Sequence, residues 1–345
     1  MGAPDSRLSA VLATAVPFAL PLRRRFRGVE VREGILIEGP SGWGEFAPFD
    51  DYSDAAAARW LDSAIEAAYG TWPEAIRSVV PVNAIVPALS AADAASLVRS
   101  AVESSGCTTV KVKVGDPFLA DDEARIAAVR AELDGLLGPG VGRIRIDANA
   151  AWDVSTATQA LRTLGAYGLE YAEQPCPSLA ELRELRSRTD VPLAADEIIR
   201  TSISPGTLRL RDSVDLAVVK PAPVGGVWTA LRLCETLGVP VVFSGAMDSS
   251  VGLDVAIATA AAAPELPFAC GFGTGALLER DVVEKPSLPV GGVLPVGRRR
   301  PDPVHLMAAF DLLPPERALW WRSRLEAAWT AGAGHRSGSL VLAAT

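Results

Sequence analysis

Residues 108–116 read TTVKVKVGD, and this short stretch decides the fold. It places Lys111 and Lys113 two residues apart in a run that otherwise has the composition of a buried strand. Because side chains alternate along a strand, the valines lie on one face and both lysines on the other. The valine face can pack against helices, so the opposite face must offer the two ammonium groups a partner.

Similar short apolar strands recur at regular intervals from about residue 82 onward. Helical stretches rich in alanine and leucine follow most of them, at 91–105, 119–136, 153–165, 178–188, 225–237 and 249–262, with a weaker one at 203–211. The predicted strands are 82–89, 109–115, 143–149, 168–174, 192–197, 215–220, 240–245 and 267–272. This alternation favours an α/β fold of the (β/α)8 barrel type over the alternative, an open doubly wound sheet.

The segments that flank this repeat have a different, α+β pattern. The apolar segment 8–22 is expected to be a strand, because its positive charges follow the apolar run, whereas in a signal peptide they precede it. Residues 53–69 have helical spacing, with Ser53 or Asp54 as the N-cap. We expect an α+β capping domain at 1–81, a barrel at 82–290, and a tryptophan-rich segment at 291–345 that returns to the capping domain.

Composition excludes several classes of protein. A formal net charge of -8 over 345 residues argues against a nucleic-acid partner. No uninterrupted apolar run is long enough to span a membrane, and four scattered cysteines suit reduced thiols in a cytoplasmic protein. With only His305 and His335, a Ser-His-Asp triad or a histidine-rich zinc site is disfavoured. The sequence does not distinguish a monomer from a homo-oligomer.

Charged residues end five consecutive barrel strands. A single charge at a strand end is usually a solvated rim residue, but five in succession are not independent accidents. The ends of barrel strands converge on one mouth, where the active sites of barrel enzymes lie. The polar residues at these ends are Lys111 and Lys113, Arg145 and Asp147, Glu173, Asp196 and Lys220, followed by Ser244 and Gly245.

The types of these residues are chemically consistent. Asp147, Glu173 and Asp196 supply three carboxylates without His or Cys, a donor set that suits Mg²⁺ better than zinc. Lys113 and Lys220 flank them in strand order. A lysine near a metal ion and a second lysine should have a lowered pKa, which makes it a usable base. A metal that binds a substrate carboxylate acidifies the adjacent C–H by stabilising the enediolate, so we expect a small-molecule carboxylate substrate.

The motifs KVKVG, IDAN, EQP, ADE and VVKP, in this order, resemble the enolase superfamily over nearly the whole chain. The match is to the subgroup with lysines on both sides of the metal. The use of a Lys or His base with Mg²⁺ is established superfamily chemistry. The resemblance implies Mg²⁺, with Mn²⁺ as a possible substitute, held by Asp147, Glu173 and Asp196.

The resemblance also implies roles for the remaining residues. Lys113 is the base, and Lys220 stabilises the enediolate from the opposite side by a cation–π contact. Lys111 and Arg145 support the base and the substrate, and Glu197 has a supporting or structural role. The implied pocket residues are Ser244, Gly245, Met247, Gly271 and Thr274.

Longer motifs, among them PLRRRFRGVEVREG, GWGEFAPF and FSGAMDSSVGL, resemble one branch of the superfamily. That branch acts in menaquinone biosynthesis and dehydrates a cyclohexadiene carboxylate that carries a hydroxyl and a succinyl group. Sister activities remain as alternatives: N-succinylamino acid racemase, dipeptide epimerase or muconate cycloisomerase. A non-catalytic ligand-binding barrel is a more distant alternative, and the complete set of lysines and carboxylates argues against it.

Overall fold

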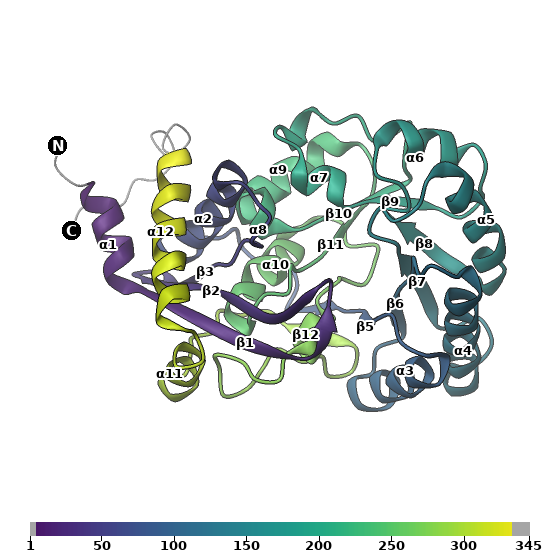
Figure 1. Cartoon of the computed structure of the whole chain (residues 1–345), viewed down its shortest axis with the longest axis horizontal. Coiled ribbons are helices and arrows are strands. Elements are labelled where there is room, and N and C mark those ends of the chain that lie inside the picture. Colours follow the sequence, from purple (N-terminus) through teal and green to yellow (C-terminus); the bar gives the residue numbers. More distant parts are fainter. Residues whose placement is uncertain (1–4, 333–345) are drawn as a thin grey trace.

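Seven parallel strands form the wall of a barrel in the computed structural model, which describes residues 5–332 (Figure 1). Their order around the sheet follows their order in the chain. Two parallel bridges, Val82 to Cys270 and Ser244 to Gly271, join the edges, so the predicted eighth strand is reduced to residues 270–271. The strands are β5 (Ala84–Val86), β6 (Thr109–Lys113), β7 (Arg143–Asp147), β8 (Leu169–Glu173), β9 (Leu193–Ala195), β10 (Leu216–Val219) and β11 (Val241–Phe243).

Helices cover the outside of the barrel, and the valine face of β6 packs against them. Val110 and Val112 are fully buried in one cluster with Val98 and Val129. The lysine face of β6 therefore points into the barrel. The covering helices are α3 (Ala91–Ser105), α4 (Leu119–Leu137), α5 (Val154–Leu164), α6 (Leu179–Arg186), α9 (Val227–Leu237) and α10 (Ser250–Ala262).

Short helical turns interrupt several of the connections between strands, and two of them directly follow β9 and β10, where the predicted site lies. The predicted helix at 203–211 is reduced to one 3₁₀ turn, η2. These turns are α7 (Glu197–Thr201), α8 (Pro221–Val224), η1 (Gly165–Tyr167), η2 (Pro205–Thr207) and η3 (Gly273–Leu277).

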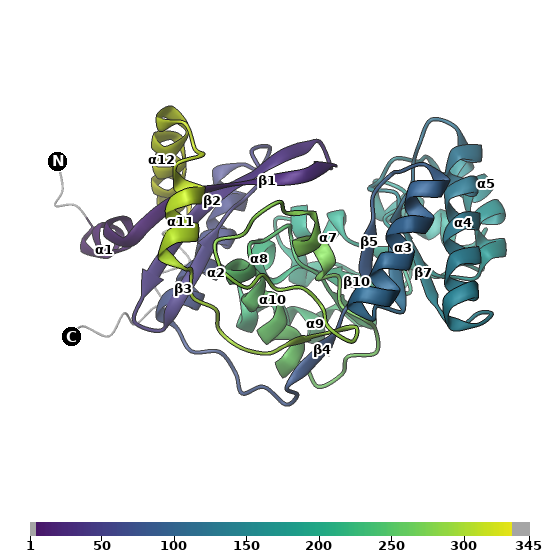
Figure 2. The same cartoon turned by 90° about the horizontal axis from the view of Figure 1, so that it is seen from below.

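An antiparallel sheet with helices packed on it lies beside the barrel (Figure 2). Gly39 and Gly44 allow α2 to approach this sheet closely, and Trp321 of α12 packs edge-on against Phe46 with ring centroids 6.0 Å apart. A further pair of strands, β4 and β12, links residues before and after the barrel. These elements are β1 (Ala15–Phe26), β2 (Val29–Gly39), β3 (Gly42–Phe46), α2 (Asp54–Tyr69), β4 (Val79–Pro81), β12 (Val293–Pro295), α11 (Pro303–Phe310) and α12 (Pro315–Ala331).

The expectation of a strand over 8–22 is wrong for its first half. Residues Ser6–Thr14 form helix α1, and β1 begins only at Ala15. The Asp5 side chain accepts a hydrogen bond from the Arg7 backbone N–H and caps the helix. Leu8 and Leu12 pack from one side of α1 against the cluster that contains Trp321. The described part of the chain contains no helix long and apolar enough to cross a membrane.

Candidate active site

The strand ends bring the predicted lysines and carboxylates to one mouth of the barrel. Lys113, Asp147 and Glu173 are the last residues of β6, β7 and β8, and they pair directly in the sheet register. Asp196 immediately follows β9, and Lys220 immediately follows β10. Parallel pairing of adjacent strands thus places residues distant in sequence side by side.

The two lysines of β6 contact different groups. Lys111 Nζ lies 3.0 Å from both carboxylate oxygens of Glu173 and 3.3 Å from Asp147 Oδ2. Lys113 Nζ donates to Asp147 Oδ2 and to Asn149 Oδ1, both at 2.5 Å. Lys111 is therefore enclosed by two carboxylates, whereas Lys113 shares one carboxylate and a neutral amide.

On the other side of the mouth, Lys220 Nζ donates to Asp196 Oδ2 at 2.5 Å. Asp196 is almost fully buried, at 1% exposed. Its Oδ1 accepts no hydrogen bond from any described residue, although Arg200 Nε lies 3.3 Å away. The two catalytic lysines predicted from the sequence therefore flank the carboxylates, as their strand order requires.

Burial and charge shift the lysine pKa values in different directions. Burial lowers the pKa of Lys113, and the charge of Asp147 does not fully compensate. Burial likewise lowers the pKa of Lys220 despite the nearby Asp196. Burial acts in the same sense on Lys111, but the Glu173 and Asp147 carboxylates outweigh it, so the Lys111 pKa is raised. The pKa is therefore lowered at Lys113 and Lys220, where burial is the main cause, but not at Lys111.

The carboxylates respond to the same charges. Burial tends to raise the pKa of Asp147, but Lys113 and Lys111 outweigh it and hold the pKa low. Burial and the Asp147 charge raise the pKa of Glu173 to about 7. Asp196 has a lowered pKa, because the charge of Lys220 outweighs the effect of burial.

The chemistry of this donor set fits a hard divalent cation. Asp147, Glu173 and Asp196 are all buried, and Asp196 has an oxygen that accepts no hydrogen bond from the described residues. Among residues 5–332, however, no three acidic, His or Cys side chains form a ready-made metal-binding cluster. Instead the lysine ammonium groups neutralise the carboxylates, so binding a cation would require those contacts to loosen.

A small cavity of about 30 Å³ adjoins these groups. Among the predicted pocket residues, Ser244, Gly245, Met247 and Thr274 line it, together with both lysines of β6, Asp147 and Lys220. Thr274 Oγ1 is buried and makes no hydrogen bond within the described residues. Gly271 lies behind Ser244, where an added Cβ would come 2.5 Å from Ser244 Oγ.

Arg145 lies on the inner side of the barrel wall but contacts the opposite ends of the strands. Its guanidinium donates to Asn83 Oδ1 at 3.0 Å, to the Ala269 carbonyl at 2.6 Å and to Glu170 Oε2 at 2.5 Å. It also packs over the Tyr171 ring at 4.9 Å. Arg145 does not line the small cavity, so any support it gives to the base is indirect.

Asn149 and Arg27 were not assigned to the site from the sequence. Asn149 accepts from Lys113 and donates to Glu197 Oε1 at 3.0 Å. Glu197 also lies 3.1 Å from Arg27 and 2.7 Å from Arg200, and its supporting role stays a prediction. The asparagine of IDAN, two residues past the end of β7, was an available signal for Asn149. Nothing local in the sequence indicates Arg27.

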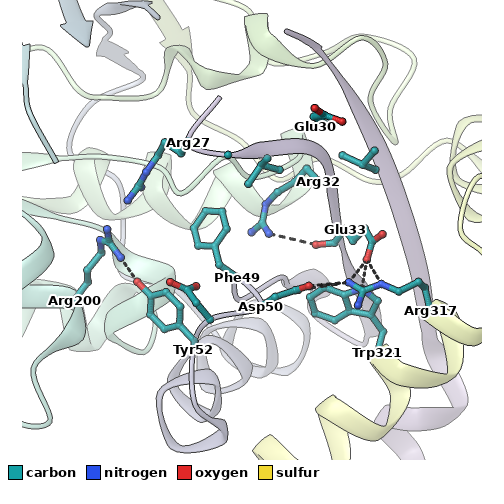
Figure 3. A pocket seen from close by; sticks show the side chains of 14 residues that line it. Arg27, Glu30, Arg32, Glu33, Phe49, Asp50, Tyr52, Arg200, Arg317 and Trp321 are labelled. Carbon is teal, nitrogen blue, oxygen red and sulfur yellow. Dashed lines mark hydrogen bonds and ion pairs between the residues drawn. The ribbon is translucent and has the colours of Figure 1, made fainter. Parts of the chain in front are cut away.

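The hairpin that joins β1 and β2 carries Arg27 and Phe26, and both line the small cavity with Ile85 and Ala246. Arg27 also lines a larger cavity of about 510 Å³ (Figure 3). Tyr52 and Arg200 contact each other across one side of it. The β1–β2 hairpin therefore contributes residues to both cavities.

Comparison with known proteins agrees with this architecture. Residues 93–301 match the family model described as enolase C-terminal domain-like, and residues 17–68 match enolase N-terminal domain-like. The fold resembles an enolase from Mycobacterium smegmatis complexed with tartrate, with a TM-score of 0.72 and 19% identity over 86% of this chain and 90% of that one. It also resembles the L-Ala-D/L-Glu epimerase from Bacillus subtilis, with a TM-score of 0.69 and 23% identity over 83% and 96%. The chain belongs to the enolase superfamily, and the predicted barrel fold is confirmed.

A relative of higher sequence identity shows to which family within the superfamily the chain belongs. The o-succinylbenzoate synthase of Thermobifida fusca is 50% identical over 317 residues, which are 91% of this chain and 96% of that protein. The chain therefore belongs to the o-succinylbenzoate synthase family and is an enzyme. Membership of this family implies a divalent metal ion and a small-molecule substrate.

Proposed function

We propose that this chain is a hydro-lyase that removes water from 2-succinyl-6-hydroxy-2,4-cyclohexadiene-1-carboxylate to give o-succinylbenzoate in menaquinone biosynthesis. One observation carries the proposal. The three lysines and three carboxylates gather at one mouth of the barrel, in a chain 50% identical to a synthase of that name.

Asp147, Glu173 and Asp196 are the residues that would hold the metal, and Mg²⁺ suits three carboxylates without His or Cys. When bound, the ion supplies positive charge at the substrate carboxylate and so makes the adjacent C–H more acidic. Mn²⁺ has similar ligand preferences and is a possible substitute.

Lys113 is the proposed base, because it ends β6 at the cavity and shares only one carboxylate. Its neutral amine takes the proton from the ring carbon that bears the carboxylate. The electron pair of that C–H bond becomes a ring double bond as the C–O bond on the neighbouring carbon breaks. The departing hydroxide takes the proton back from Lys113 and leaves as water. The ring is then aromatic, and Lys113 has regained its starting protonation state.

Lys220 and Lys111 have supporting charges in this scheme. Lys220 lines the cavity from across the mouth, where its ammonium group stabilises the negative charge that develops on the substrate. Lys111, bound between Glu173 and Asp147, stays protonated and holds these two carboxylates in place. Ser244 and Thr274 are candidates for hydrogen bonds to the substrate's polar groups.

One observation favours racemisation of N-succinylamino acids as a second activity. Lys113 and Lys220 line the same cavity from different strands, so each could exchange a proton on its own face of a substrate carbon. Racemisation needs proton transfer by both lysines, whereas dehydration needs only the charge of Lys220.

The test is a direct comparison of kcat/KM for the two reactions, with Mg²⁺ and after chelation. We expect dehydration to be the faster reaction and to disappear without metal. A wild type that racemises N-succinylamino acids faster than it dehydrates the cyclohexadiene would overturn the proposal. Lys220→Arg separates the roles, because arginine keeps the charge but is a poor proton donor. In that variant, dehydration should be retained while racemisation is lost, and solvent deuterium should enter only the enantiomer whose α-proton faces Lys113.

A further inference from the structure

The loop after β11, residues 246–249, lines the small cavity with Ala246 and Met247, and the capping sheet contacts this loop. Arg32 of β2 is only 3% exposed, and its Nε donates to the Met247 carbonyl at 3.1 Å. The same guanidinium donates to the Ala47 carbonyl and, at 3.3 Å, to the Glu33 carbonyl. Arg32 also lies 4.5 Å from the centre of the Phe49 ring (Figure 3). Its orientation is therefore fixed by contacts on several sides.

Met247, which receives this hydrogen bond, has an unusual backbone conformation. Its φ is +64°, in the left-handed region that L-residues other than Asn, Asp and Gly rarely adopt. The side chain is 3% exposed and packs with Phe26, Ile85 and Leu277. This conformation therefore directs an apolar side chain into the cavity, and a neighbouring group must maintain it.

Two acidic side chains hold the residues on either side of Met247. Asp248 Oδ2 accepts from the Ala246 backbone N–H at 2.7 Å. Glu45 of β3 accepts from the Ser249 backbone N–H at 3.1 Å. Both carboxyl groups interact electrostatically with Arg32. Among these contacts, the one from Arg32 is made directly to the strained residue.

We propose that Arg32 is a positioning residue for substrate binding, which acts by holding Met247 in its left-handed conformation. The side chain of Met247 then closes the cavity against the apolar part of the substrate. Arg32 lines the larger cavity but not the small one, and it contacts none of the reacting groups, so its effect passes through the Met247 carbonyl. The proposal rests on the proposed function, since it concerns the fit of that substrate.

A double-mutant cycle tests this coupling. Arg32→Met removes the donors, and we expect KM for the cyclohexadiene to rise roughly tenfold, as for loss of one hydrogen bond, with a smaller change in kcat. Met247→Gly removes the side chain, and glycine adopts a positive φ without the hydrogen bond from Arg32. In the Met247→Gly background, Arg32→Met should change KM by less than about twofold, because coupled residues are not additive. The Tm should fall in both backgrounds, because the contacts to Ala47 and Glu33 are lost in both.

Arg317→Met is the matched control. Arg317 lines the larger cavity and binds Glu33 and Asp50, but it does not contact the loop, so KM should stay unchanged. If Arg32→Met does not fold, Arg32→Lys enters the same cycle, since one ammonium group cannot reach all three carbonyls in the guanidinium geometry. Affinity for o-succinylbenzoate, measured by calorimetry, gives a second cycle independent of turnover.

The outcomes separate the two proposals. Additive effects of the two substitutions on KM and on product affinity, or an unchanged KM in Arg32→Met, would overturn the role of Arg32. A wild type that does not dehydrate the cyclohexadiene at all would overturn the proposed function instead.

Discussion

At the scale of single residues, the site shows how position along one strand changes the chemistry of a side chain. Lys111 and Lys113 share a strand and a face, yet Lys111 lies between two carboxylates and Lys113 between a carboxylate and an amide. The first environment keeps an ammonium group charged, whereas the second makes its loss of a proton easier. This difference supports the proposed division of labour within the pair.

Lys113→Ala should reduce kcat for dehydration by at least about 10²–10⁴-fold, the usual cost of a missing general base. Lys111→Ala should be milder, because its proposed role is to hold Glu173 and Asp147. Steady-state kinetics of the purified variants would measure both effects, with circular dichroism to establish that each is folded. An inactive Lys111→Ala beside a nearly normal Lys113→Ala would reverse the assignment.

Asp196→Asn should weaken metal binding and activity together, because it replaces a charged ligand oxygen with a neutral one. Titration calorimetry with Mg²⁺ measures the affinity, and kcat/KM at saturating Mg²⁺ measures the remaining activity. Asp254→Asn is the matched control: this carboxyl is equally buried, but it pairs with Arg299 outside the proposed site. Equal Mg²⁺ affinity in the Asp196→Asn variant and the wild type would contradict the ligand assignment, as would full activity after exhaustive chelation.

The free energies involved explain how the single contact from Arg32 can hold Met247 in its left-handed conformation. A left-handed conformation costs an L-residue about 1–2 kcal/mol. A hydrogen bond from a charged donor contributes about 1.5–3 kcal/mol. The Arg32 contact is therefore large enough to offset the backbone strain at Met247.

At the scale of elements, the strands of the barrel were predicted where alternation and apolar runs are strong, as at β6 and β7. The eighth strand, predicted at 267–272, was overestimated: only Cys270 and Gly271 form bridges to the neighbouring strands, and Gly271 packs closely against Ser244. Helix α1 was missed because a nine-residue helix next to a long apolar strand leaves little periodic signal. Its cap at Asp5 was the one local feature that indicated it.

The contact between β3 and α2 depends on a glycine. An added Cβ at Gly44 would lie 1.9 Å from the Ala64 carbonyl oxygen, which belongs to helix backbone and cannot rotate away. Gly44→Ala should therefore lower the free energy of unfolding by about 1–3 kcal/mol or more, through overpacking. Chemical denaturation of the purified variant would measure this loss.

Gly135→Ala provides the comparison. Gly135 is exposed in α4, and an added Cβ there has no atom within 4 Å, so alanine should stabilise the helix by about 1 kcal/mol. Equal and small effects of the two substitutions would show that α2 can move away from β3 at little cost.

At the scale of the whole molecule, the site contains residues of the barrel and residues of the capping sheet. No local sequence pattern connects the two groups. The strand-end lysines and carboxylates were predictable, because parallel strands bring their ends together. Phe26, Arg27 and Arg32 come from the capping sheet, and their positions depend on how the β1–β2 hairpin docks on the barrel. That docking is set by packing across the whole interface, which sequence spacing does not encode.

A second long-range contact should make stability depend on pH. Asp254 in α10 accepts hydrogen bonds from the backbone and side chain of Arg299, in the segment that leads to α11. Burial raises the pKa of Asp254 from 3.8 to about 7, and the Arg299 charge only partly opposes it. Between these two values the folded state binds more protons than the unfolded state, so stability falls as pH rises. Above about pH 7 both states are ionised at this carboxyl, and its contribution stops changing.

Asp254→Asn isolates this contribution from those of other buried acids. Asparagine keeps the shape and can still accept from Arg299, but it does not titrate. We expect the free energy of unfolding of the wild type to fall relative to the variant between about pH 4 and 7, by at most about 4 kcal/mol for a pKa difference of about three units. Urea unfolding of both proteins at a series of pH values gives the difference curve. If the ion pair with Arg299 outweighed burial, the wild type would instead gain stability over the variant as pH rises, so the sign of the slope decides between the two effects.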